Sequence, residues 1–329
     1  MKKTGKRLLA AMLLFCTILI GAAGYEVMAA DEAQSTESTS GTVNSADDLP
    51  GKRIGVQLGT TGDIYVSDYE SDGSGTVVER YNKGADAIQA LKQGKIDCVV
   101  IDEQPAIKFV EQNTGIRILD EEFTIEEYAF VIAKDNTELL DKVNSVLEKL
   151  EADGTIANIQ KSYIGTEDEI GKFPYESKDV SHENGTLTVG TNAEFPPYES
   201  YEDGQIVGID MDIMRAVSDE LGMELKIEDM AFDSIIPAIS TGKVDIGAAG
   251  FTVTEERKKN VNFTDTYTTS KQVIIVKDDT VTSEKAGLSE KFYDNFVKDS
   301  RYVYLLKGLG NTLLITAVSY THLTLPTIC

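Results

Sequence analysis

The chain has 329 residues, 41% of them hydrophobic, which is enough for about two globular domains. Its 55 Asp and Glu residues outnumber 31 Lys and Arg residues and give a formal net charge of −24. This charge argues against a nucleic-acid-binding or anionic-lipid-binding protein, because both partners are polyanions. Three cysteines and two histidines offer no disulfide framework and no metal-ligand spacing, so neither a metal nor another cofactor is expected.

The first 30 residues have the pattern of an export signal. Four positive charges precede an apolar run at residues 8–20, and residues 27–29 offer a small-residue cleavage site. An uncleaved anchor is the alternative. Residues 31–48 are rich in Ser, Thr and Asp and predict a flexible tether. We therefore expect the protein at the extracytoplasmic face of the cell membrane.

Folded structure is predicted from residue 49 onward. A strand at 52–56, a helix at 85–93 and a strand at 98–101 form a βαβ-like unit. Apolar residues between 139 and 150 recur at helical spacing, with Thr137 as the candidate N-cap and Gly154 at the end. A second helix at 156–163 is predicted to stop at Gly165, and a polar linker follows at 166–185.

The second half of the chain predicts another α/β unit. It begins with a strand at 187–190 and a helix at 210–221, which ends at Gly222. A helix at 232–239 and a strand at 246–249 follow. Residues 273–276 form an apolar strand that we expect to lead out of the domain.

A short pattern occurs once in each half. The sequence ALKQGKID at residues 90–97 is echoed by AISTGKVD at residues 238–245, and both lead into an apolar strand. In each copy a helix is predicted to end at the Gly. Two similar α/β units indicate two lobes with a cleft between them, and such clefts bind small ligands at the carboxyl ends of strands.

Longer motifs resemble one known family. In the second half they are GTNAEFPPYE at 190–199, GIDMD at 208–212, AGFTVTEER at 249–257 and VNFT at 261–264. These are similar to the first lobe of the polar amino-acid-binding proteins, the extracytoplasmic receptors of amino-acid ABC importers. The resemblance implies the α/β, two-lobed type II periplasmic-binding fold, whose lobes are joined by a hinge. In the first half, the sequences that resemble lobe 2 and the C-terminal return to lobe 1 are KRIGVQLGTT at 52–61, VID at 100–102 and YAFVIAK at 128–134.

The order of these parts departs from the family, in which lobe 1 comes first and lobe 2 is inserted into it. Here lobe 2 (residues 49–127) and the return part of lobe 1 (128–165) precede the main part of lobe 1 (186–277). We therefore expect a circular permutation, in which the linker at 166–185 joins the family's usual ends. Permutation is tolerated where the termini lie close together at the surface. Two half receptors in tandem are the alternative.

The resemblance also implies a set of ligand-binding residues. Asp102, the Gly250 carbonyl and the Thr252 hydroxyl would bind the α-ammonium of an amino acid. Arg257 would bind the α-carboxylate as a two-pronged donor, together with backbone N–H groups of Thr252 and Thr61. No residue has an expected catalytic role, so the chain is predicted not to be an enzyme.

The ligand side chain would be recognised by three further residues. Phe195 and Phe232 would enclose it, and Asn192 would contact its polar end, which favours a glutamine-like amino acid. Each assignment has a structural alternative. Arg257 lies in a charged run that suits a solvated helix, Asp102 suits a turn, and the phenylalanines suit an ordinary core.

The end of the chain resembles a different protein. Residues 302–317, YVYLLKGLGNTLLITA, are similar to the start of an amino-acid ABC permease. We expect a linker at 278–300, the start of a transmembrane domain at 301–317, and ABC permease and ATPase subunits as partners. Residues 318–327, VSYTHLTLPT, look like a translated sequencing adapter, so the tail at 318–329 is expected to be non-native.

These observations predict a binding protein that delivers a polar amino acid to a fused ABC permease for import. Two alternatives remain. The first is the amino-acid-sensing input domain of a membrane receptor, which would continue into a signalling domain. The second is a dehydratase-like enzyme on the same fold, which would need an acid–base pair in the cleft.

Overall fold

Two sheets organise the part of the chain that this computed structural model describes, which is residues 42–121, 124–278, 302–303, 306–312 and 316. The expected export signal, most of the tether and of the linker at 278–300, and the expected non-native tail lie outside these residues. Ser45 and the residues after it form one unit, separate from Met1–Asn44. The predicted two-lobed α/β fold is confirmed.

The sheet of lobe 2 combines both halves of the chain. Its strand β1 (Arg53–Gln57) lies parallel to β2 (Val77–Tyr81) on one side and to β3 (Cys98–Asp102) on the other. The next strand in the sheet is β14 (Thr268–Lys277), which is antiparallel to β3 and to β4 (Ile116–Ile118). Helices pack against this sheet; they are α2 (Thr61–Ser67), α3 (Gly84–Lys92) and α4 (Glu103–Gln112).

The sheet of lobe 1 likewise combines parallel and antiparallel strands from both halves of the chain. Strand β7 (Thr186–Thr191) lies parallel to β11 (Glu224–Asp229) and to β12 (Ile246–Gly247). The early strand β6 (Val131–Ala133) pairs antiparallel with β12 and with β13 (Val261–Phe263). The helices of this lobe are α5 (Thr137–Ala152), α6 (Thr155–Ile164), α7 (Ile209–Leu221) and α8 (Phe232–Ser240), and a three-stranded ribbon is formed by β8 (Glu194–Phe195), β9 (Glu199–Glu202) and β10 (Gln205–Val207).

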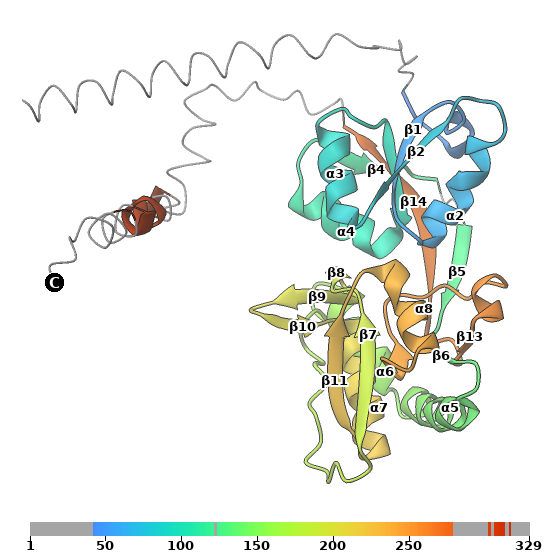
Figure 1. The fold of residues 1–329 in the computed structure, drawn as a ribbon, viewed down its shortest axis with the longest axis vertical. Coiled ribbons are helices and arrows are strands. Elements are labelled where there is room, and N and C mark those ends of the chain that lie inside the picture. Colours follow the sequence, from blue (N-terminus) through green and yellow to red (C-terminus); the bar gives the residue numbers. More distant parts are fainter. Residues whose placement is uncertain (1–41, 122–123, 279–301, 304–305, 313–315, 317–329) are drawn as a thin grey trace, which may run out of the picture. The chain divides into compact units, whose positions relative to one another are not determined.

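Two antiparallel segments connect the lobes. Strand β5 (Thr124–Tyr128) pairs with β14, and Figure 1 shows the two strands running together between the sheets. The chain enters lobe 1 through Ala129 and Phe130 and returns to lobe 2 through residues 264–267. This pair of crossings is the hinge that the resemblance implied.

The position of β14 differs from the expectation that residues 186–277 all belong to lobe 1, whereas the apolar strand does lead out of that lobe as predicted. Val273–Val276 lie in the middle of the lobe 2 sheet, where they pair with β3. The apolar run indicated burial correctly. It carried no information about the partner strand, because a strand buried on both faces is equally apolar in either sheet.

Local signals at the helix ends were mostly correct. Gly165 and Gly222 end α6 and α7 as predicted. The N-cap of α5 is Asn136, whose side chain accepts a hydrogen bond from the Leu139 N–H at 3.2 Å, so the assignment of the cap to Thr137 was wrong by one residue. Asparagine and threonine both cap helices, so residue type alone does not separate Thr137 from the asparagine before it.

Two expected connectors are more ordered than predicted. Residues 46–48, at the end of the expected tether, form a 3-10 turn (η1). In the linker at 166–185, the Tyr175 hydroxyl and the Lys178 backbone N–H both donate to Asp219 on α7 at 2.8 Å. These bonds hold the linker against lobe 1.

The aspartate of each copy of the repeated pattern joins two neighbouring parallel strands. Asp97 accepts a hydrogen bond from the Arg53 N–H at 2.8 Å, and Asp245 accepts one from the Thr188 N–H at 2.8 Å. In each case the backbone N–H of the aspartate also donates to the carbonyl of the same partner. Each aspartate therefore ties the start of its strand to the neighbouring parallel strand, once in each lobe.

The expected permease segment is described only in part. Residues 302–303, 306–312 and 316 are helical. Within the described residues, no helix combines the length and apolar character needed to cross a membrane.

The equivalence of the two aspartates can be tested by unfolding. Asp97→Ala and Asp245→Ala should each lower the free energy of unfolding by about 1–3 kcal/mol, because each leaves a strand N–H without its charged acceptor. Chemical denaturation monitored by circular dichroism measures this. Glu148→Ala, at an exposed position of α5, is the control and should change it by less than about 0.5 kcal/mol. Loss at one aspartate only would contradict the equivalence.

Candidate functional site

One pocket gathers all eight residues that the resemblance indicated. The predicted residues in its lining are Thr61, Asp102, Asn192, Phe195, Phe232, Gly250, Thr252 and Arg257, and the structure adds Gln57, Thr60, Glu199 and Ala249. Both lobes contribute. The structure thus brings the predicted set together, and its ligand-binding role stays a prediction.

Strand ends position the polar residues of this pocket. Gln57 and Asp102 are the last residues of the neighbouring parallel strands β1 and β3, and Asn192 directly follows β7. The carboxyl ends of parallel strands meet at one edge of a sheet, where side chains can converge. Gly250 follows β12 with a φ of 56°, and a Cβ there would lie 3.0 Å from the Phe195 ring. Glycine therefore permits both the left-handed turn and the close approach of this ring.

Arg257 connects the two lobes. Its Nη1 donates to the Thr252 carbonyl oxygen at 2.8 Å, and its Nη2 donates to the Gly59 carbonyl oxygen of lobe 2 at 3.0 Å. The guanidinium carbon lies 5.5 Å from the centre of the Phe232 ring and 5.4 Å from that of Phe251. Although Arg257 is buried, it forms no ion pair with an acid among the residues that the structure describes. Burial lowers the pKa of Arg257, and the group stays charged at neutral pH.

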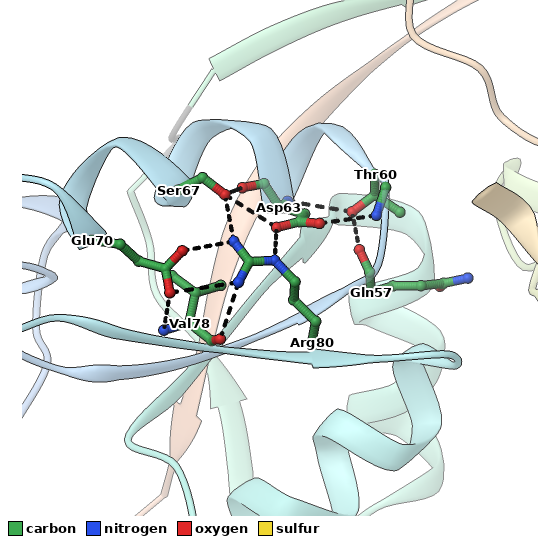
Figure 2. A network of polar contacts seen from close by, with 8 residues as sticks. Gln57, Thr60, Asp63, Ser67, Glu70, Val78 and Arg80 are labelled. Atoms are coloured by element: carbon green, nitrogen blue, oxygen red, sulfur yellow. Dashed lines mark hydrogen bonds and ion pairs between the residues drawn. The ribbon is translucent and has the colours of Figure 1, made fainter.

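A second network, drawn in Figure 2, holds the loop that receives Arg257. The Asp63 carboxylate accepts hydrogen bonds from the Gly59 N–H at 2.9 Å and from Arg80 Nε at 2.8 Å. Arg80 also donates to the Glu70 carboxylate at 2.8 Å. The Gly59 carbonyl therefore faces Arg257 from a loop fixed by a salt-bridged aspartate.

Glu126 lies beside the pocket and was not expected there. Its Oε2 accepts hydrogen bonds from the Thr61 hydroxyl at 2.9 Å and from the Thr252 hydroxyl at 2.6 Å. The buried carboxylate thereby joins a threonine of lobe 2 to one of lobe 1. No sequence signal indicated this role, because β5 buries Glu126 and exposes Ile125, the reverse of the usual hydrophobic pattern.

Asp102 is buried at the end of β3, where it accepts a hydrogen bond from the Tyr128 hydroxyl. Burial, together with the nearby Glu126 carboxylate, raises the pKa of Asp102 to about 7. Burial also raises the pKa of Asp210 to about 7. Asp210 accepts a hydrogen bond from the Gly250 N–H at 3.0 Å, so it holds the turn that carries Gly250.

The two predicted aromatic residues pack in the core and also line the pocket. Phe232 stacks on Phe251 at 4.7 Å between ring centres, and Phe195 stacks on Tyr198 at 5.9 Å. The core alternative and the pocket assignment are therefore compatible. Cys98 is buried in β3, where burial raises the pKa of its thiol to about 12. Among the described residues, no group of three His, Cys, Asp or Glu side chains is arranged to hold a metal ion.

Comparison with known sequences decides the family. The profile of the bacterial extracellular solute-binding proteins, family 3, matches residues 74–166 and 187–303, which is more than half of the chain. The chain belongs to this family. The match falls in two segments separated by residues 167–186, which nearly coincide with the linker at 166–185, and each segment contributes residues to the pocket.

Individual members of this family are similar over shorter segments. The chain is 44% identical over 84 residues to the arginine-binding protein ArgT of Corynebacterium glutamicum, which is 25% of this chain and 28% of that protein. It is 29% identical over 137 residues to the L-cystine-binding protein TcyJ of Escherichia coli, which is 41% of this chain and 50% of that protein. The chain thus spans half or less of the length of these curated relatives, which are binding proteins.

A solved structure shows a similar partial match to the chain. The arginine-bound form of domain 1 from TmArgBP is 43% identical, with 29% of this chain and 83% of that chain covered and a TM-score of 0.26.

Asp102 should make the ligand-free protein less stable as the pH rises. Its pKa of about 7 in the folded protein lies above the ~3.9 of an unfolded aspartate, so Asp102 stays protonated to a higher pH in the folded state. The contribution of protonated Asp102 to the free energy of unfolding is fully present below pH ~4 and is lost as the pH rises through about 7. The melting temperature of the wild type minus that of Asp102→Asn should therefore fall between pH 5 and pH 8. A constant or rising difference would show that Asp102 does not titrate this way.

Proposed function

We propose that this pocket binds a free polar amino acid on the extracytoplasmic side of the membrane, for import by an ABC transporter. The observation that carries the proposal is the buried guanidinium of Arg257, which forms no ion pair within 4 Å among the described residues and is acted on only from further away by the carboxyls of Glu126 and Asp102. A buried charge is costly unless it is paired, so the pocket is complete only with an anion. The α-carboxylate of an amino acid supplies that anion and accepts two parallel N–H bonds.

The α-ammonium requires an anionic partner of its own. Asp102 and Gly250 both line this pocket. The Thr252 hydroxyl donates its proton to Glu126, which leaves the lone pairs of the hydroxyl oxygen free to accept from an ammonium. Glu126 therefore orients Thr252 as an acceptor. The two ends of a zwitterion would be neutralised by residues of different lobes.

The ligand side chain would lie against Phe195 and Phe232, with Asn192 at its polar end. Because the neutral Asn192 amide offers no charge, a glutamine-like ligand is favoured. Amino-acid binding should stabilise the arrangement in which the lobes are in contact, since each lobe supplies part of the site. That closed state would be the signal to the permease and ATPase subunits.

We also propose that the chain is a circular permutant of the family. Support comes from the sheets, since β6 of the early segment completes lobe 1 and β14 of the late segment completes lobe 2. Neither segment has a full sheet of its own, which disfavours two half receptors that fold separately. The linker at 166–185 would join the family's usual ends.

Fusion to a permease rests on the resemblance of residues 302–317. Sequencing of the genomic locus tests it directly. An open reading frame that continues from this segment into further apolar spans is expected, and a stop codon after Cys329 in clean reads would contradict the fusion.

Removal of the guanidinium should abolish binding. Arg257→Ala is expected to weaken amino-acid binding by at least about 30-fold, because a truncated buried ion-pair partner costs about 2–5 kcal/mol. Isothermal titration calorimetry against polar amino acids measures the change. Lys142→Ala on α5, an exposed cation away from the pocket, is the matched control and should bind as the wild type does. Micromolar affinity retained by Arg257→Ala would refute the assignment.

Affinity should also increase with pH up to about 7. In the ligand-free protein the pKa of Asp102 is about 7, and an ammonium ligand requires the ionised carboxylate. Binding below pH 7 therefore releases a proton and weakens by up to about tenfold per pH unit. Calorimetry at pH 5, 6, 7 and 8 measures the slope. In Asp102→Asn the slope should vanish along with much of the affinity, and an unchanged slope would place the titrating group elsewhere.

A further inference from the structure

The turn at residues 57–61 of lobe 2 contacts lobe 1 at every second residue. The polar pairs are Gln57 with Asn192 at 2.9 Å, Gly59 with Arg257 at 3.0 Å and Thr61 with Thr252 at 3.3 Å. All three partners in lobe 1 line the pocket. The turn is therefore the part of lobe 2 that meets the pocket side of lobe 1.

Contacts within lobe 2 fix the shape of this turn. The Thr60 N–H donates to the Gln57 carbonyl oxygen at 3.3 Å, and Gly59 has a φ of 77°. This is the geometry of a type II β-turn, which needs a left-handed residue in its third position. From α2, the Asp63 carboxylate accepts hydrogen bonds from the Gly59 N–H at 2.9 Å and from Arg80 Nε at 2.8 Å (Figure 2). All of these groups belong to lobe 2, so they hold the turn independently of lobe 1.

The missing side chain of Gly59 permits the close approach of the two lobes. A Cβ at this residue would lie 3.3 Å from Asp233 Cβ and 3.7 Å from Asp233 Cα, in the first turn of α8. These atoms cannot swing aside as the end of a flexible side chain can, because they move only with the helix. The neighbouring Phe232 lines the pocket. A side chain at residue 59 would therefore hold this wall of the pocket away from lobe 2.

We propose that the turn at 57–61 is the surface on which lobe 1 closes, and that Gly59 and Asp63 are positioning residues for ligand binding. Neither residue belongs to the pocket lining, so both would act through the approach of the lobes and not through contact with the ligand. This inference rests on the proposed function, because it assumes a ligand that is bound between the lobes. Apparent affinity falls in proportion to the population of the binding-competent arrangement, which here is the closed one.

A matched pair of glycine substitutions tests the inference on the full chain. Gly59→Ala adds a methyl group that meets α8, whereas Gly115→Ala adds one in lobe 2 with no atom within 4 Å. The φ angles of the two glycines are 77° and 80°, so both substitutions strain the backbone alike and should lower the melting temperature to a similar extent. Calorimetry then measures the affinity for whichever of the twenty amino acids the wild type binds most tightly. Only Gly59→Ala should weaken it, by about tenfold or more.

The possible outcomes separate this inference from the proposed function. Wild-type affinity in a folded Gly59→Ala, or an equal loss in Gly115→Ala, would overturn the inference and leave the proposed function standing. A wild type that binds none of the twenty amino acids would remove the proposed function and this inference with it.

A second pair of variants tests the role of Asp63. Asp63→Ala removes the acceptor of the Gly59 N–H, and the freed turn should weaken ligand binding about fivefold or more. Glu79→Ala is the control, because it breaks a 3.2 Å ion pair with Arg53 in the same lobe without touching the turn, and it should bind as the wild type does. Melting curves show whether each variant is folded. Unchanged affinity in a folded Asp63→Ala would refute its positioning role, and this pair decides the inference if Gly59→Ala does not fold.

Discussion

The structure depends on a positive charge that is buried between two lobes and forms no ion pair with an acid among the described residues, although Glu126 and Asp102 act on it from further away. The Arg257 guanidinium bonds the Thr252 carbonyl of its own lobe and the Gly59 carbonyl of the other. Two phenylalanine rings cover it, and Arg80 and Asp63 fix the loop that it reaches. Carbonyl dipoles and ring faces stabilise a cation only in part. The remaining demand for an anion gives the pocket its chemistry.

Both halves of the sequence contribute strands to each lobe, and both therefore contribute to this pocket. Strand β6 is early in sequence and lies inside the lobe 1 sheet, whereas β14 is late and lies inside the lobe 2 sheet. The lobes are tied together where β5 pairs with β14, and Glu126 on β5 bonds a threonine from each lobe. A residue of the hinge strand β5 therefore bonds directly to two residues that line the pocket. If a ligand binds Thr252, Asp102 and Arg257 as proposed, it would act through Glu126 on the segment about which the lobes would move.

Sequence patterns predicted the helices α3 and α5 to α8 and the strands β1, β3, β7, β12 and β14, because apolar spacing and glycine stops are local. The helices α2 and α4 and most of the other strands, which are shorter or less apolar, were not predicted. They could not assign β14 to its sheet, since burial identifies a core strand but not its neighbours. The cap of α5 was misplaced by one residue because two adjacent side chains are both good caps. In the pocket, the resemblance supplied eight residues that the structure brings together. Gln57, Glu126 and Glu199 were missed, because buried polar side chains run against the hydrophobic pattern and are revealed only by their partners, or by the lack of them.

The most direct test of the account is a thermal-shift screen of the twenty amino acids on the full chain. Ligand at about 1,000 times its dissociation constant stabilises a folded protein by about 4 kcal/mol, a shift that is easily measured. The account predicts that at least one polar amino acid raises the melting temperature in a saturable way, and that compounds lacking either the α-amino or the α-carboxyl group do not. Equal shifts with and without those groups, or no shift with any of the twenty, would contradict it.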